Sequence, residues 1–219
     1  MRRFAMLLLL VPVTAFAAER RYPVPQIDRI RVQGPFEVTV TAGPKTEVVV
    51  EGEGDLDRAD VRVEGSTLTL GGRIDASSTP LHIRVTADGV TAASVSTRGS
   101  LAIEAMPGDR IDLAVNGIGR LQVAGIRAGE LRITAAGQGA ITFAGEAKQV
   151  AMRVLGTFEV DGSALAADEL TLYSGNDGAA KLNVRSHARI TNVGPGAVAV
   201  AGHATCDVHG KARVDCAGR

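Results

Sequence analysis

A short motif, in which glycine is followed by alternating apolar residues, recurs through the second half of the chain and constrains its fold more than any other feature. Successive anchor glycines are 18, 20, 19, 19, 19 and 16 residues apart. Each copy has two runs of alternating residues, separated by glycines that can take the positive φ of a sharp corner. The repeating unit is therefore a strand, a corner and a strand. The expected corner glycines are Gly99, Gly117, Gly137, Gly156, Gly175, Gly194 and Gly210.

The length of the repeat selects a fold class. A period near 19 residues is shorter than that of helix-pair repeats or of a four-stranded propeller blade, and the copies lack the ladder of leucine-rich repeats. The small, β-prone residues Val, Ile, Leu and Ala, with 26 glycines, suit narrow stacked coils. The sequence predicts an all-β fold, a right-handed parallel β-helix or solenoid with coils of about 19 residues.

The N-terminal third alternates without this repeat. Several short alternating runs lie within residues 18–94, and Gly65-Ser66 between two of them is the signal for a two-residue hairpin. The first repeats of such arrays differ from the others, because a bare sheet edge promotes aggregation. We expect residues 18–94 to form antiparallel strands and first rungs that cap the solenoid, and residues 95–219 to form its regular coils.

The first residues have the order of a secretory signal peptide. Arg2 and Arg3 precede the apolar run Met6 to Val13, and Ala15-Phe16-Ala17 is a small-x-small cleavage site. We expect a signal peptide over residues 1–17, with cleavage between Ala17 and Ala18. The apolar run is too short to span a membrane, so the mature chain is expected to be exported, to the periplasm or beyond, without a transmembrane segment.

Charge and composition argue against nucleic acid as a partner. Removal of Arg2 and Arg3 leaves 22 basic against 24 acidic side chains, and nucleic acid requires a concentrated basic face. Only five aromatic residues follow the predicted cleavage site, so platforms for stacking bases or sugars are scarce. Nucleic acid is therefore not an expected partner.

Two cysteines in the last copy suggest a disulfide. Cys206 and Cys216 would be oxidised in an exported protein, and their bond would fix the C-terminal end of the stack. The alternative is a metal site, since His203, Cys206 and His209 are spaced by threes. Residues 206 and 209 of a strand point to opposite faces, however, so the disulfide is the preferred interpretation.

Carboxylates are the remaining candidates for chemistry. The densest acidic neighbourhood comprises Asn176, Asp177, Asp161, Asp168 and Glu169. Such a group could supply a general acid and base or bind Ca²⁺, as in a carbohydrate-active β-helix enzyme. Carboxylates in loops are more often simply solvated. We therefore expect no catalytic residue, no metal site and no cofactor.

The order of motifs resembles that of the head-GIN family, known as autotransporter adhesin head domains of unknown function. The resemblance rests on the exported start, Ile27 to Val40, Val48 to Gly52, the hairpin Val63 to Leu70 and the glycine-anchored copies. It covers nearly all of the mature chain. The resemblance implies a right-handed β-helix and carries over no catalytic residues.

These observations favour a non-enzymatic envelope or secreted module, adhesin-like or structural, that binds an envelope polysaccharide or a protein surface. The first alternative is a carbohydrate-active β-helix enzyme that uses the acidic neighbourhood around Asn176. The second is a scaffold that associates with itself through the ends of its coils. Stacked carboxylates in a groove would favour the enzyme, and an uncapped edge would favour self-association.

Overall fold

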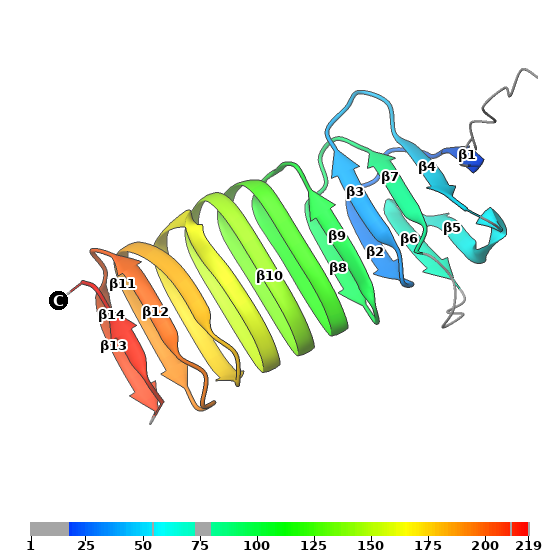
Figure 1. Ribbon diagram of the computed structural model, residues 1–219. Helices are drawn as coiled ribbons and strands as arrows, with labels where there is room; N and C mark the ends of the chain where they lie inside the picture. The colour runs from blue at the N-terminus through cyan, green and yellow to red at the C-terminus, as the bar shows by residue number, and fades with distance from the viewer. Residues whose placement is uncertain (1–17, 54, 73–79, 211, 219) are drawn as a thin grey trace, which may run out of the picture.

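The protein is described by a computed structural model covering residues 18–53, 55–72, 80–210 and 212–218. The predicted signal peptide, including Ala17, lies outside these residues. The described part of the chain forms one 14-stranded sheet that wraps around a single elongated core (Figure 1). No helix in these residues is long and apolar enough to cross a membrane.

The elements follow one another along the length of the molecule, with β1 near one end and β14 at the other (Figure 1). In chain order they are β1 (Ala18–Pro23), β2 (Arg29–Gln33), β3 (Glu37–Thr41), β4 (Glu47–Gly52), the 3-10 helix η1 (Leu56–Arg58), β5 (Ala59–Glu64), β6 (Thr67–Gly72), β7 (His82–Thr86), β8 (Ala92–Ser96), β9 (Gly99–Ile103), β10 (Met106–Asn176), β11 (Ala180–Asn192), β12 (Val198–Gly202), β13 (Thr205–Gly210) and β14 (Val214–Cys216).

From β8 onward the chain pairs in parallel with its own preceding pass, and we call each such pass a rung. Asp112 of β10 pairs with Ala92 of β8, twenty residues earlier, and Val198 of β12 pairs with Ala180 of β11, eighteen residues earlier. Alternate residues of these strands are buried and exposed, as the period of a strand requires. The spacing of the glycine motif therefore reflects the spacing of rungs.

The N-terminal strands change the character of the sheet. β1 and β7 both pair with β4 in antiparallel fashion, and β5 pairs with β6 in the same way. The hairpin predicted at Gly65-Ser66 is present, with Gly65 at φ +60°. A two-residue turn reverses the chain, so the strands that it joins must run antiparallel.

The predicted fold class is therefore wrong beyond its all-β character. The structure is a mixed sheet, antiparallel and parallel, that wraps nearly closed around its core, and not a right-handed parallel β-helix solenoid. The error arose because alternation looks the same in both kinds of pairing. The relative direction of two paired strands depends on how the chain connects them, and several of these connections lie outside the glycine repeat.

The core is a stack made mostly of aliphatic side chains, with a few phenylalanines among them. Phe143 and Phe158 are fully buried, and most of their neighbours are Val, Ile, Leu and Ala. Full burial of each such aromatic or branched side chain stabilises the fold by about 1.5–3 kcal/mol. Three polar residues, Ser174, Asn176 and Asn192, are buried in the same core.

Candidate functional site

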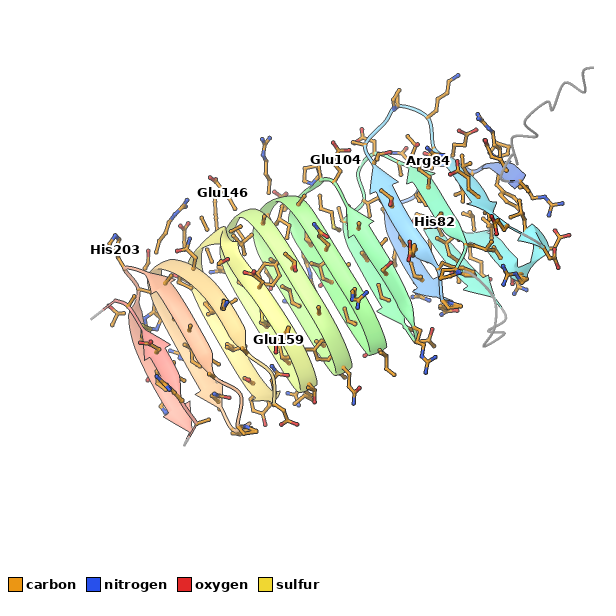
Figure 2. All side chains as sticks on the ribbon, in the orientation of Figure 1. His82, Arg84, Glu104, Glu146, Glu159 and His203 are labelled. Carbon is orange, nitrogen blue, oxygen red and sulfur yellow. A yellow bond between two sulfur atoms is a disulfide. The ribbon has the colours of Figure 1, made fainter. Side chains whose placement is uncertain are left out.

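The cysteines and histidines of the last rungs do not form a metal site. Cys206 and Cys216 are joined by a disulfide. His203 is exposed at a long edge of the molecule (Figure 2), and His209 Nε2 lies 3.2 Å from the Asp207 carboxylate. Within the described residues no three His, Cys, Asp or Glu side chains are placed to hold a metal ion.

The acidic neighbourhood expected around Asn176 is dispersed. Asn176 is buried, and its side chain accepts from the Phe158 N–H at 2.7 Å and donates to the Phe158 and Gly178 carbonyls at 2.8 Å each. Its role is to complete backbone hydrogen bonding at a corner. Asp168 pairs with Arg185 at 3.2 Å, and Glu169 accepts from Gln149 at 3.4 Å.

Asp161, another member of that neighbourhood, has a local partner of its own. Its carboxylate accepts from the Ser163 hydroxyl at 2.6 Å and from the Ser163 N–H at 3.1 Å. These hydrogen bonds lower the pKa of Asp161 below its ordinary value, because they favour the charged form. A general acid at neutral pH needs a raised pKa, so the shift is in the wrong direction for that role.

The seven expected corner glycines occupy several different positions. Gly117, Gly137 and Gly156 stack directly on one another with positive φ. A Cβ at Gly137 would lie 2.3 Å from the Gly117 carbonyl oxygen, and one at Gly156 would lie 2.1 Å from the Gly137 carbonyl oxygen. The other four meet different atoms: Gly99 lies against the Gly34 carbonyl, Gly175 against the Leu155 side chain, Gly194 against Asn176 and Gly210 against Asn192.

Charged side chains elsewhere are spread along the molecule (Figure 2). Glu104 and Glu146 lie at one long edge, and His82 and Arg84 lie on β7. His82 Nδ1 is 3.1 Å from Glu37, and Arg84 forms an ion pair with Glu51. These two pairs join neighbouring strands and line an open depression of about 250 Å³.

One outer surface has a defined depression, which we call the arginine depression. Its volume is about 310 Å³, and it crosses β2, β8 and the first two rungs of β10. The register places Ala92 between Arg29 and Asp112, and Ser94 between Arg31 and Ala114. Because the middle positions carry small side chains, the surface is lowered between the longer ones. The outward-facing side chains that line it are Arg29, Arg31, Ala92, Ser94, Asp112, Ala114, Arg132 and Thr134.

The arginine depression carries excess positive charge. Asp112 is 3.4 Å from Arg110, and Arg132 is 2.6 Å from Glu130. Arg29 and Arg31 have no ion-pair partner in the described part of the chain. Two uncompensated guanidinium groups therefore border a floor of small side chains. Such groups recognise carboxylates, phosphates and sulfates through paired hydrogen bonds.

Sequence reasoning missed this surface. The overall charge balance argued against a basic face, and the arginines come from strands separated by about a hundred residues of sequence. The alternation of Arg29 and Arg31 with Ile30 and Val32 does put both arginines on the outer face of one strand. The missing information was the register, which brings Ala92, Ala114 and Arg132 alongside them.

Comparison with known proteins identifies similar sequences and structures. The family model described as "Putative auto-transporter adhesin, head GIN domain" matches residues 26–204. No curated protein matches the chain.

Several solved structures are similar in fold. A putative adhesin from Bacteroides fragilis NCTC 9343 has a TM-score of 0.80 at 18% identity, covering 93% of this chain and 98% of its own. A putative adhesin from Parabacteroides distasonis ATCC 8503 has a TM-score of 0.70 at 17% identity, covering 91% and 96%. A putative lipid binding protein from the same strain has a TM-score of 0.64 at 15% identity, also covering 91% and 96%. At these identities the likeness concerns the fold.

Proposed function

Since the chain belongs to the head GIN domain family of putative auto-transporter adhesins, we propose that it is an exported, non-enzymatic module that binds an anionic polymer at the arginine depression. The observation that carries the proposal is the pair Arg29 and Arg31, uncompensated by carboxylates of the described chain and set beside a floor of Ala92, Ser94 and Ala114. Membership of the family confirms the resemblance seen in the sequence.

The shape of the arginine depression suits a polymer better than a small substrate. It is an open trough on the outside of a sheet. Side chains of neighbouring strands line it, and the register holds these strands side by side. Enzyme pockets and small-molecule sites enclose most of their ligand, and this one does not. A chain of repeated carboxylate, phosphate or sulfate groups could contact Arg29, Arg31 and Arg132 together, which raises affinity through several weak contacts.

Export is the second part of the proposal. Cleavage between Ala17 and Ala18 would leave all of β1 in the mature protein, because β1 begins at Ala18. Six residues of β1 pair with β4, so this strand belongs to the folded unit. Expression of the full chain in a secreting bacterium, followed by mass spectrometry of the secreted N-terminus, tests the cleavage site. A mature chain starting elsewhere, or retained in the cytoplasm, would contradict it.

The binding test compares polymers that differ in charge. The purified mature chain is titrated with polygalacturonate, dextran sulfate and neutral dextran, and affinity is measured by biolayer interferometry at two salt concentrations. Binding to the charged polymers only, weakened by salt, is the expected result. The double variant Arg29→Ala with Arg31→Ala should bind about tenfold more weakly, since each lost charge pair on an exposed surface contributes up to about 1 kcal/mol.

The matched control is Arg120→Ala. Arg120 is also an exposed arginine of the sheet, but it lines a different depression, on the strands that contain Ser100 and Gly139. Its removal should leave the affinity unchanged. Equal loss in both variants would mean general charge attraction and would refute the assigned site. Vesicles of anionic lipid are included because one similar structure is that of a putative lipid binding protein; preference for vesicles over polymers would replace the proposed ligand.

A further inference from the structure

The last rung of the sheet is exposed in a way that no earlier rung is. β13 pairs with β11 and β14 with β12, and neither has a second partner in the described residues. The inward columns that contain Ile190 and Val198 continue into Val208 and Val214. Ile190 and Val198 are fully buried, whereas Val208 is 43% exposed. The final rung therefore offers two strand edges with apolar side chains between them.

The disulfide fixes how these two strands face each other. Cys206 lies near the start of β13 and Cys216 at the end of β14, and their Cα atoms are 6.6 Å apart. The strands therefore run in opposite directions on either side of the core. Val208 lies two residues after Cys206, and Val214 lies two residues before Cys216, so the two valines face each other. A line through these two valines crosses the middle of the rung.

The residues on the outer faces differ in charge between the two sides of that line, with Asp207 and Asp215 on one side and His209 and Arg213 on the other. Asp207 and His209 flank Val208, and Arg213 and Asp215 flank Val214. Each flanking pair has one acidic and one basic member. Arg213 and Asp215 have no ion-pair partner in the described chain. A two-fold rotation about the line would place Asp207 against His209 of a second copy, and Arg213 against Asp215 of that copy.

The backbone of β14 is oriented for the same arrangement. The Val198 N–H donates to the Arg213 carbonyl at 3.1 Å, and the Ala217 N–H donates to the Val200 carbonyl at 2.9 Å. Residues 213 and 217 thus direct their backbone groups toward β12. Because these groups alternate along a strand, Val214 and Cys216 direct theirs toward the open edge. An antiparallel pairing centred on Val214 would form two backbone hydrogen bonds between the valines themselves.

We propose that two copies of this chain associate end to end through β13 and β14, which pair antiparallel with their own counterparts about a two-fold axis through Val208 and Val214. The contact continues the sheet and covers Val208. It also brings Arg213 of each copy beside Asp215 of the other, and Asp207 of each copy beside His209 of the other. An interface of this type uses the same surface on both copies and therefore closes at a dimer. The proposal is independent of the arginine depression, which lies toward the other end of the molecule.

The test uses reversal of charge on β14. The oxidised wild-type chain should show a reversible monomer–dimer equilibrium by analytical ultracentrifugation. Arg213→Asp and Asp215→Arg, each made alone, place like charges opposite each other and should weaken dimerisation by about tenfold or more. The double variant that carries both changes restores opposite charges and should dimerise again. An equimolar mixture of the two single variants should form heterodimers that are stronger than the homodimers of either variant alone.

A control variant and a check of folding keep the test decisive. Arg62→Asp reverses a charge on β5, an edge strand at the other end of the sheet, and should leave the equilibrium unchanged. Circular dichroism establishes that each variant is folded. A wild-type chain that stays monomeric, or a dimer that is equally strong in every variant, would overturn the proposal. Single variants that associate only with wild type, and not with each other, would also exclude the antiparallel register.

Discussion

The two ends of this molecule use the same alternating strands in different ways. Between β1 and β7 several strands pair antiparallel, two of them across the tight turn at Gly65, and a Cβ at Gly65 would meet nothing within 4 Å. From β8 onward the chain winds forward, and glycines lie directly against the backbone of the preceding rung. At Gly65 glycine provides only a dihedral angle. At Gly137 and Gly156 it provides both the angle and the space for the neighbouring chain, so these positions should tolerate far less change.

The largest effect is expected where the two kinds of glycine are compared directly. Gly137→Ala would strain a residue at φ +121° and push a Cβ to 2.3 Å from the Gly117 carbonyl oxygen. Strain and overpacking together should lower the free energy of unfolding by about 4 kcal/mol. Gly65→Ala is strained but not crowded and should cost only about 1 kcal/mol. Urea denaturation measures both. Equal losses would show that stacking adds nothing to the dihedral requirement.

A second test concerns Asn176, at the corner where the stack of Gly117, Gly137 and Gly156 is interrupted. Asn176→Ala would leave the Phe158 N–H and two carbonyls without their side-chain partner inside the core. The expected loss is about 3 kcal/mol, since each buried unsatisfied polar group costs about 1–3 kcal/mol and some can rebind water. Asn183→Ala, at a less buried position of β11, is the control and should change stability little. If both variants lose the same free energy of unfolding, the hydrogen bonds of the Asn176 amide do not stabilise the fold.

The disulfide separates the last rung from the rest of the sheet. Replacing Cys206 and Cys216 together by alanine should reduce stability by roughly 2.8 kcal/mol, from the chain entropy of a loop of about 11 residues. Hydrogen exchange should show that protection falls mainly in β13 and β14, because the bond lies within one rung. The β1–β4 pairing should keep its protection. A uniform loss along the chain would mean that the two ends unfold as one unit.

The smallest effect is expected for acid stability. Hydrogen bonds from Ser163 lower the pKa of Asp161 in the folded state. A lowered folded-state pKa stabilises the fold above the unfolded-state pKa, and that stabilisation is lost as the pH falls through the folded-state value. Ser163→Ala should raise the pKa of Asp161 toward its ordinary value, as followed by carboxyl NMR titration. Because Asp161 is exposed, stability at neutral pH should change only slightly. A pKa unchanged in the variant would contradict the assigned cause.

Much of the local structure could be read from the sequence. The alternation of Ile30 and Val32 with arginines, the turn at Gly65 and the pairing of Cys206 with Cys216 depend on neighbouring residues or on the repeat. Strand direction and register depend on contacts between distant segments. They determine that β4 returns antiparallel between β1 and β7, and that Arg132 lines the same depression as Arg29. The predicted fold class was wrong because it required strand directions, and the arginine depression was not predicted because it required the register.

Parallel pairing from rung to rung also has a mechanical consequence. The hydrogen bonds between rungs run along the length of the molecule, whose first and last strands lie at opposite ends (Figure 1). A tensile load between those ends stretches these bonds along their own direction, and no covalent crosslink joins one described rung to the next, because Cys206 and Cys216 belong to the same rung. Rungs should therefore peel away in succession, each releasing about 70 Å of extended chain for its twenty residues. Such a molecule yields to force in steps and dissipates work at each one.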